Sequence, residues 1–365
     1  HNLRSSRAGK AAVQRFALSG LWWPLRELFE GRTPLSGWRL GDPLQIGRVV
    51  IVDLQFEDPL SQSWRIRTAV LEGIDLARFD ARIEPGPSSA AILGARLLLA
   101  TSLEHFKAMD VAYTRPGSAD RIAVSDLATE GIARGKFGGF NISGIESAGA
   151  KAGEPAFRLD QVKVAGLDLG RVLGNLAQPG WRVGMPLGRI DLDRASATGF
   201  GGEAMSRYGI SLASVTTETS REEGGIARMK SRIDGFVLSP PARGMVGVQM
   251  RVMMTAMGLK DLRLGLDCQA TEDRGHGEVG VDRCTLVGTD LGDVEFSAKF
   301  TGADSPFWTA VDSGNVGELF RSSIAFASAR LVMADKSLLE RWFRAMAISS
   351  GQQATAVRQA MAQEV

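Results

Sequence analysis

Residues 209–300 alternate between apolar and polar side chains through most of their length, and this alternation constrains the fold more than any other feature. Successive side chains of a β-strand point to opposite faces, so residues two apart share a face. The pattern therefore predicts consecutive strands that each have one apolar face. In the clearest stretch the apolar positions are Val246, Val248, Met250, Val252, Met254, Leu262, Leu264, Leu266 and Cys268.

The turns between these strands predict an antiparallel meander. Gly-rich and Pro-rich segments separate the apolar runs, and such residues favour tight reversals of the chain. We expect six strands, at 209–220, 226–238, 245–257, 262–270, 279–286 and 294–300. Several approach a dozen residues, whereas five or six is typical. This length favours a mainly β fold built on a long, curved antiparallel meander sheet.

Outside the meander the sequence predicts more strands and a few helices. Strands are expected at 50–56, 64–71 and 323–333. The Ala-rich and Leu-rich segment Ser88–Met109 predicts a helix, and shorter helices are expected at 22–29, 169–176, 307–311, 336–346 and 352–363. We divide the chain into an N-terminal segment (1–40), a first β-rich half with one or two helices (41–200), and the meander with C-terminal helices (201–365). The two halves either are separate or share one continuous sheet.

The composition excludes several classes of function. The chain has 365 residues, of which 44% are hydrophobic, so it can form one large or two moderate cores. It contains 43 Lys and Arg against 41 Asp and Glu, without the dense basic stripe of a nucleic-acid-binding protein. The sequence contains no run of 18 apolar residues and therefore predicts no transmembrane helix within these residues. The chain begins at His1 rather than Met, which predicts an upstream segment that could contain a signal peptide or an N-terminal anchor.

Motifs that would indicate an enzyme are missing from the sequence. The three histidines, His1, His105 and His276, are far apart and lack metal-ligand spacing. There is no Gly-x-Ser-x-Gly elbow, no Walker-type phosphate loop and no dinucleotide-binding fingerprint. The carboxylates lie in segments typical of turns. We therefore expect no catalytic residue, no metal and no cofactor.

The two cysteines flank a predicted hairpin turn. Cys268 and Cys284 have His276 at their midpoint, so a symmetric hairpin would place them opposite each other, within reach of a disulfide. A disulfide would indicate an oxidising compartment. The alternative is two unbonded apolar side chains on a sheet face. The apolar phase shifts between Val281 and Cys284, which predicts a β-bulge that would disturb the pairing.

A short motif recurs at the ends of strands. It occurs as Gly73–Arg78, as Gly166–Arg171 and more loosely as Gly288–Asp293. Together with the long amphipathic strands and the segment Lys336–Phe343, it resembles the AsmA and YdgA-like group of β-rich proteins of the bacterial envelope. The resemblance implies an open, trough-shaped sheet with an apolar inner face, a role in lipid movement or envelope assembly, and an N-terminal anchor. It implies no catalytic residue.

These observations predict a non-enzymatic periplasmic protein, anchored to the inner membrane through the upstream segment, that binds or conducts a lipid or another hydrophobic ligand. The predicted apolar groove is lined by Val248, Met250, Val252, Met254, Leu264 and Leu266. The alternative is a structural subunit of an envelope protein complex. In that case the helices at 88–109 and 336–346 cover the same face and close the core.

Overall fold

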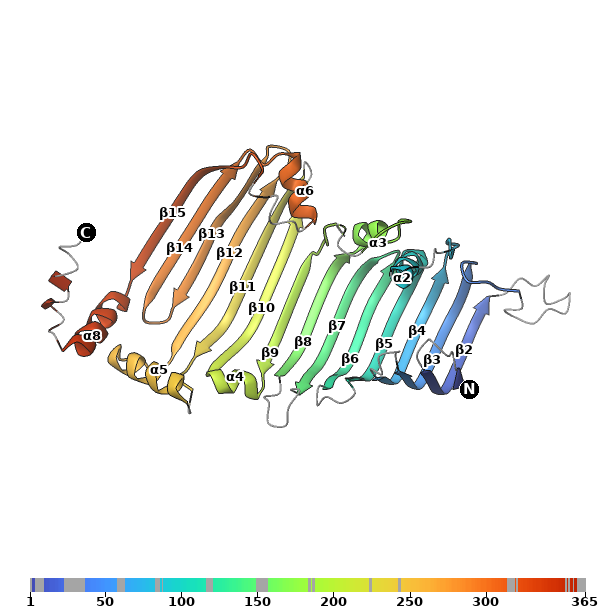
Figure 1. Ribbon diagram of the computed structural model, residues 1–365, viewed down its shortest axis with the longest axis horizontal. Coiled ribbons are helices and arrows are strands. Elements are labelled where there is room, and N and C mark those ends of the chain that lie inside the picture. Colours follow the sequence, from blue (N-terminus) through green and yellow to red (C-terminus); the bar gives the residue numbers. More distant parts are fainter. Residues whose placement is uncertain are drawn as a thin grey trace. The chain divides into compact units, whose positions relative to one another are not determined.

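A computed structural model of the chain shows a mainly β architecture (Figure 1). It describes residues 2–3, 10–22, 37–57, 63–82, 86, 88–115, 121–148, 157–182, 185, 188–222, 225–241, 244–313, 319, 321–351, 353, 355–356 and 358–359. The chain forms two compact units. The first comprises residues 1–152, 161–195 and 304–322, and the second comprises residues 153–160, 196–303 and 323–365.

The first unit contains long strands and three helices. Its strands are β1 (Asn2–Leu3), β2 (Lys10–Trp22), β3 (Leu44–Glu57), β4 (Ser63–Leu76), β5 (Thr101–Thr114), β6 (Arg121–Ala133), β7 (Lys136–Ala148) and most of β8 (Phe157–Asp168). Its helices are α2 (Ser89–Ala100), α3 (Gly170–Leu176) and α6 (Ser305–Ser313). Helices α2 and α3 pack on each other, and the Arg96 guanidinium donates a hydrogen bond to the Ala177 carbonyl at 3.1 Å.

The second unit contains the predicted meander. Its strands are most of β9 (Arg194–Gly201), β10 (Ile210–Arg221), β11 (Ile226–Leu238), β12 (Leu262–Asp273), β13 (Glu278–Gly288), β14 (Gly292–Thr301) and β15 (Ala325–Asp335). Its helices are α4 (Glu203–Tyr208), α5 (Met245–Ala256) and α8 (Leu338–Ser350). Within each unit the paired strands are antiparallel and follow sequence order, and the sheet is open, which confirms the predicted fold class.

Three predicted elements differ in the structure. Residues 245–257, predicted as a strand, form helix α5, so strand β11 pairs directly with β12. The helix predicted over Ser88–Met109 ends at Ala100, and the chain continues as strand β5. Residues 10–22, which we placed in an N-terminal segment, form strand β2 and pair with β3. The helix predicted at 22–29 lies outside the described residues from 23 onward, and the one at 352–363 lies largely outside them.

Strands of the first unit contain single residues in the left-handed region of the backbone map. Asp53 in β3, Asp110 in β5 and Gly144 in β7 have φ of 50°, 52° and 62°. The apolar alternation of β3 changes phase across this position, from Ile51 on one side of Asp53 to Leu54 on the other. Because one non-extended residue interrupts the alternation of side chains, simple period-two patterns do not extend through these strands.

The recurring glycine motif marks two of these left-handed positions. Gly73 in β4 and Gly166 in β8 both have φ of 63°. A Cβ atom on Gly73 would collide with the side chain of Glu104, and one on Gly166 would collide with Asp193. Glycine is therefore required both by the backbone conformation and by the neighbouring carboxylate side chain.

Both units bury few side chains. In the described part of the chain no large side chain is completely buried. The accessible surface is 23194 Å², whereas a compact globular protein of this length exposes about 14,000 Å². The sheets are thus not enclosed by packed layers as in an ordinary globular domain.

Candidate functional site

The sheet formed by β10–β15 has one apolar face, which its cross-strand pairs define. One row of directly opposed residues crosses all six strands and is entirely apolar: Val215, Ile233, Leu266, Leu286, Val294 and Met333. The next row on the same face is Thr217, Ser231, Cys268, Cys284, Phe296 and Leu331, and the third is Thr219, Met229, Ala270, Val281, Ala298 and Ala329. We call these three rows the apolar face.

Large side chains of the apolar face are accessible to solvent. Leu331 is 71% exposed, Met229 46%, Met333 44%, Phe296 40% and Leu286 39%. Soluble proteins rarely expose large contiguous apolar patches, and a patch of this kind indicates a binding surface. The apolar face is therefore the candidate functional site of the described chain.

Two helices of the second unit, α5 and α8, pack on each other, and the short helix α4 contacts strand β10. Arg341 of α8 donates hydrogen bonds to the carbonyls of Met257 and Gly258 at 3.1 and 2.9 Å. Figure 1 shows both helices at the ends of the strands. The face remains open among the described residues.

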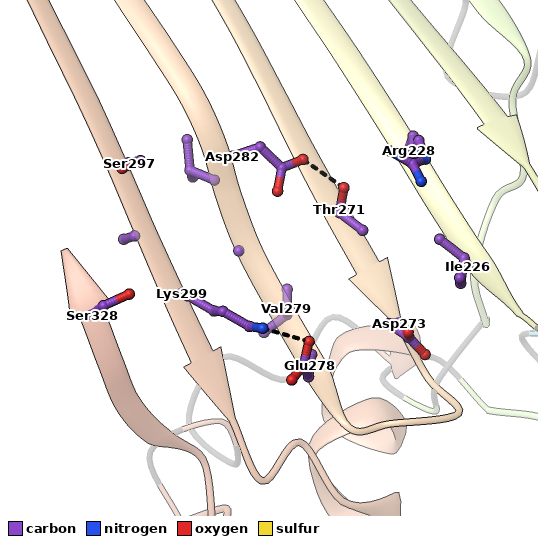
Figure 2. A pocket seen from close by; sticks show the side chains of 13 residues that line it. Ile226, Arg228, Thr271, Asp273, Glu278, Val279, Asp282, Ser297, Lys299 and Ser328 are labelled. Carbon is purple, nitrogen blue, oxygen red and sulfur yellow. Dashed lines mark hydrogen bonds and ion pairs between the residues drawn. The ribbon is translucent and has the colours of Figure 1, made fainter. Parts of the chain in front are cut away.

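The opposite face of the same sheet is polar. One of its rows is Thr216, Arg232, Asp267, Thr285 and Glu295, ending at Val332 on β15, and another is Ser220, Arg228, Thr271, Gly280, Lys299 and Ser328. A shallow depression of about 390 Å³ lies on it (Figure 2). In this depression the Lys299 ammonium pairs with the Glu278 carboxylate at 2.7 Å, and the Thr271 hydroxyl donates a hydrogen bond to Asp282 at 2.5 Å.

The charged groups around this depression neutralise one another. The Asp273 carboxylate accepts hydrogen bonds from the His276 backbone N–H at 3.0 Å, and one of its oxygens lies 2.8 Å from the His276 ring nitrogen Nδ1. These contacts hold the pKa of Asp273 below its usual value, the backbone N–H having the larger effect. Asp282 and Glu278 have the partners described above. The acids therefore stabilise a hairpin and its ladder, and they do not form an unpaired catalytic dyad.

The described residues offer few other sites for chemistry. Among them, no three His, Cys, Asp or Glu side chains gather in a way that could hold a metal ion. None of the described helices has the length and apolar character needed to cross a membrane. The apolar face thus remains the candidate site among the described residues.

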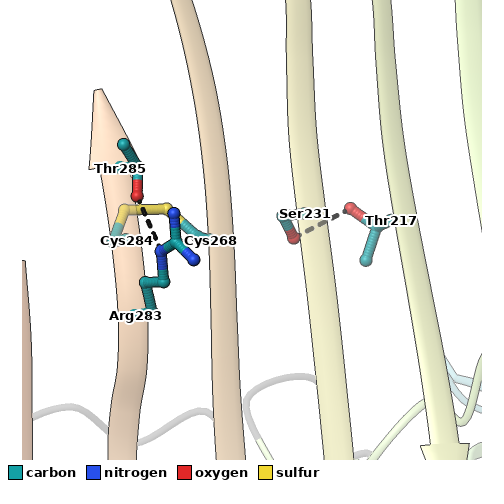
Figure 3. The surroundings of a disulfide bond; sticks show 6 residues. All are labelled: Thr217, Ser231, Cys268, Arg283, Cys284 and Thr285. Atoms are coloured by element: carbon teal, nitrogen blue, oxygen red, sulfur yellow. Dashed lines mark hydrogen bonds between the residues drawn. A yellow bond between two sulfur atoms is a disulfide. The ribbon is translucent and has the colours of Figure 1, made fainter. Parts of the chain in front are cut away.

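The two cysteines lie within the apolar face. Cys268 and Cys284 are cross-strand partners in the β12–β13 hairpin and form a disulfide (Figure 3). The predicted bulge is present: the register shifts between Gln269 and Ala270, where β13 has one extra residue, and the cysteine pair lies just beyond it. On the neighbouring strands of the same row, the hydroxyls of Thr217 and Ser231 are hydrogen-bonded at 3.2 Å.

The structure separates the residues of the predicted groove. Leu264 and Leu266 lie on β12, and Leu266 belongs to the apolar face. The remaining four residues, Val248, Met250, Val252 and Met254, lie on helix α5 and not on a strand, so they are not part of a sheet face with Leu264 and Leu266 as predicted. On this helix Met254 is buried, whereas Val248 and Val252 are 50% and 65% exposed.

Leu266 on β12 is the one residue of the apolar face that the sequence assigned to the predicted groove, and the parts of the face on β10, β11 and β13–β15 were not assigned to it. Leu286, Phe296, Leu331 and Met333 were not assigned to the site, although strands were predicted at their positions. The alternation of Val294, Phe296 and Ala298 indicated that one side of β14 is apolar. Assigning that side to the same face as Leu266 required the register of the neighbouring strands, which the sequence does not show.

Comparisons of this chain with family models, with curated proteins and with solved structures find no match. The sheet of β10–β15 has one accessible apolar face opposite one polar face.

Proposed function

We propose that the protein binds a lipid or a similar long hydrophobic ligand on the apolar face of β10–β15, without catalysing a reaction. The observation that supports this proposal is the six-residue row from Val215 to Met333, which is apolar on every strand. A face without charged groups selects a ligand by hydrophobic contact rather than by charge or hydrogen bonding.

The dimensions of the face suit an acyl chain. Neighbouring strands lie about 4.8 Å apart, so a row that crosses six strands spans roughly 24 Å. A lipid chain that fills one leaflet extends about 15 Å, which is half of the hydrocarbon core of a bilayer. One acyl chain can therefore lie along a row from strand to strand, and its end need not protrude from the sheet.

The energy of contact is sufficient for reversible binding. Complete burial of a methylene group contributes about 0.8 kcal/mol. A chain on an open face buries one side only, so about half of this value applies to each methylene group. A dozen methylene groups would then contribute roughly 5 kcal/mol, and the apolar side chains beneath them leave water at the same time and add a further contribution. Association costs at least about 4 kcal/mol, so we expect a single chain to bind weakly and to be released readily.

The disulfide favours a location in the cell envelope. Disulfides persist in oxidising compartments such as the periplasm and are rare in the cytosol. The Cys268–Cys284 bond also joins the two central strands of the apolar face, so it holds the surface in one register. The disulfide thus supports the proposal that lipid binding takes place in the periplasm.

The alternative function, a scaffold subunit, makes a different use of the same face. It requires the face to be covered by protein, and the helices first expected to cover it, α2 and α8, make their principal contacts with α3 and α5 instead. A partner protein would have to supply the cover.

Lipid binding can be tested with two matched lysine variants on adjacent residues of β13. Leu286→Lys places a charge in the apolar row between Leu266 and Val294. Thr285→Lys, the control, places the same charge on the polar face between Asp267 and Glu295. The protein is purified without detergent, its native mass is measured, and binding of a fluorescent fatty acid is titrated.

We expect copurified lipid or saturable probe binding in the wild type. Leu286→Lys should weaken binding at least tenfold, about 1.4 kcal/mol, because the charge must be desolvated beneath the chain. Thr285→Lys should change it less than twofold. A clean apo mass without probe uptake would favour the scaffold, and equal weakening by both variants would contradict the assignment of the face.

A further inference from the structure

Strand β15 is the edge strand of the second unit's sheet in the described part of the chain. It pairs with β14 on one side, and within the described residues no strand pairs with its other side. All eleven of its residues are exposed. An edge strand presents unpaired backbone N–H and C=O groups, and the element that satisfies such a row is another β-strand.

The sequence of β15 has little of the usual protection of an edge. Natural edge strands are shortened, charged, bulged, interrupted by proline or covered. This strand is long, contains no proline and has Arg330 as its only charge before the final Asp335, and its one bulge lies near its start, between Phe326 and Ser328. An edge of this composition pairs readily with a further strand.

We propose that β15 pairs with β15 of a second copy of this chain, antiparallel and centred on Leu331. A two-fold axis perpendicular to the sheet produces an antiparallel pair and keeps the same face of both copies on the same side. In this register Leu331 lies opposite Leu331 of the second copy, and Ala329 lies opposite its Met333. The apolar rows of the two copies then form one continuous surface.

The charges of β15 select this register over its neighbours. Centring the pair on Arg330 would place two guanidinium groups directly opposite each other, which is destabilising. Centring it on Val332 would place Asp335 of one copy opposite Ala329, within the apolar row. Centring it on Leu331 places Arg330 opposite Val332 on the polar face, so no like charges meet.

The opposite edge of the chain fits β15 less well. Strand β2 already pairs with β1 at Ala11 and Ala12, and Gly20 of β2 has φ of 66°. Strand β15 has no residue in the left-handed region. If β15 paired with β2, the residues of β15 that face one side would therefore match apolar residues of β2 on one side of Gly20 only. A closed pair of identical edges is therefore favoured over an open chain of copies.

The test is a charge-swap on the polar face, measured by sedimentation equilibrium and native mass spectrometry. Val332→Lys places an ammonium group opposite Arg330 of the second copy, twice in each dimer. Within one copy Val332 faces Glu295 of β14, so the added lysine does not disturb folding of the monomer. Arg330→Glu combined with Val332→Lys replaces the repulsion by two ion pairs, and Arg330→Glu alone is the control.

We expect a wild-type dimer, a dissociation constant at least tenfold higher in Val332→Lys, and recovery of the dimer in the double variant. A monomer at every soluble concentration would overturn the proposal, as would a double variant that dissociates like the single one. Residues 330 and 332 lie on the polar face, so fatty-acid binding should be unchanged in all three variants. Failure of this proposal and failure of lipid binding are thus separable.

Discussion

The two faces of the β10–β15 sheet differ in how their side chains are satisfied. On the polar face the charged groups pair across strands, as Lys299 does with Glu278 and Arg283 with Glu295, at 2.7 and 3.2 Å. On the apolar face the contacts between neighbours leave large side chains such as Leu331 exposed. The charged groups of the polar face thus find partners within the sheet, whereas large side chains of the apolar face remain exposed to water.

This difference is the reason for proposing the apolar face, and not the polar one, as the binding site. Exposed ion pairs contribute little to stability, and a surface made of them is satisfied in water. An exposed apolar surface lowers its free energy when a ligand or a protein covers it. The comparison can be tested by changing each face separately and asking which property responds.

The largest expected effect on stability is that of the disulfide on the apolar face. The Cys268–Cys284 bond closes a loop with a sequence separation of 16 residues. Closing such a loop in the unfolded chain stabilises the fold by about 3 kcal/mol. Replacing both cysteines by alanine should lower the free energy of unfolding by that amount, as measured by urea denaturation. An identical urea midpoint would show that the ladder alone fixes the hairpin.

The second effect compares neighbouring residues of β14 on opposite faces. Phe296 lies between Cys284 and Leu331 in the apolar row. Because it is 40% exposed, Phe296→Ala should cost about 2 kcal/mol, less than the 3–5 kcal/mol of a fully buried phenylalanine. Ser297→Ala, on the polar face, should stay within about 0.5 kcal/mol of the wild type. Equal losses in both variants would mean that the faces contribute alike.

Sequence patterns predicted the two faces but not every strand that forms them. Alternation in β12 and the turn around His276 were sufficient to place Cys268 opposite Cys284, because a hairpin is a local structure. The same reasoning failed for Met245–Ala256. Residues four apart, such as Val248 and Val252, share a face in a strand and also in a helix. Methionine and glutamine then favour the helix.

The openness of the apolar face could not be predicted. It depends on where α5 and α8 pack, and they contact each other. The amphipathic pattern of α8 shows only that one side of the helix must be covered, because a partner helix and a sheet face impose the same spacing. Likewise, the run of Ala and Leu in Ser88–Met109 gives no signal that the helix ends at Ala100.

A smaller effect is expected from the polar face. Lys299 and Glu278 are both substantially exposed, so their ion pair should contribute about 1 kcal/mol or less. A double-mutant cycle with Lys299→Met and Glu278→Gln should give a coupling energy in this range that decreases as salt is added. The cost of Phe296→Ala should not decrease with salt. A coupling energy that persists in high salt would contradict the view that this face is satisfied in water.

The smallest effect is the pH dependence of the hairpin turn. Hydrogen bonds from His276 lower the pKa of Asp273, so the carboxylate stabilises the fold above its unfolded pKa of about 3.9. This contribution is lost as the pH falls through the lowered pKa of the folded state. The melting temperature of Asp273→Asn should therefore lie slightly below that of the wild type at neutral pH. This difference in melting temperature should disappear in acid, because the other carboxylates titrate equally in both proteins. A difference in melting temperature that does not change with pH would mean that the amide replaces the carboxylate poorly because of its geometry and not because of its charge.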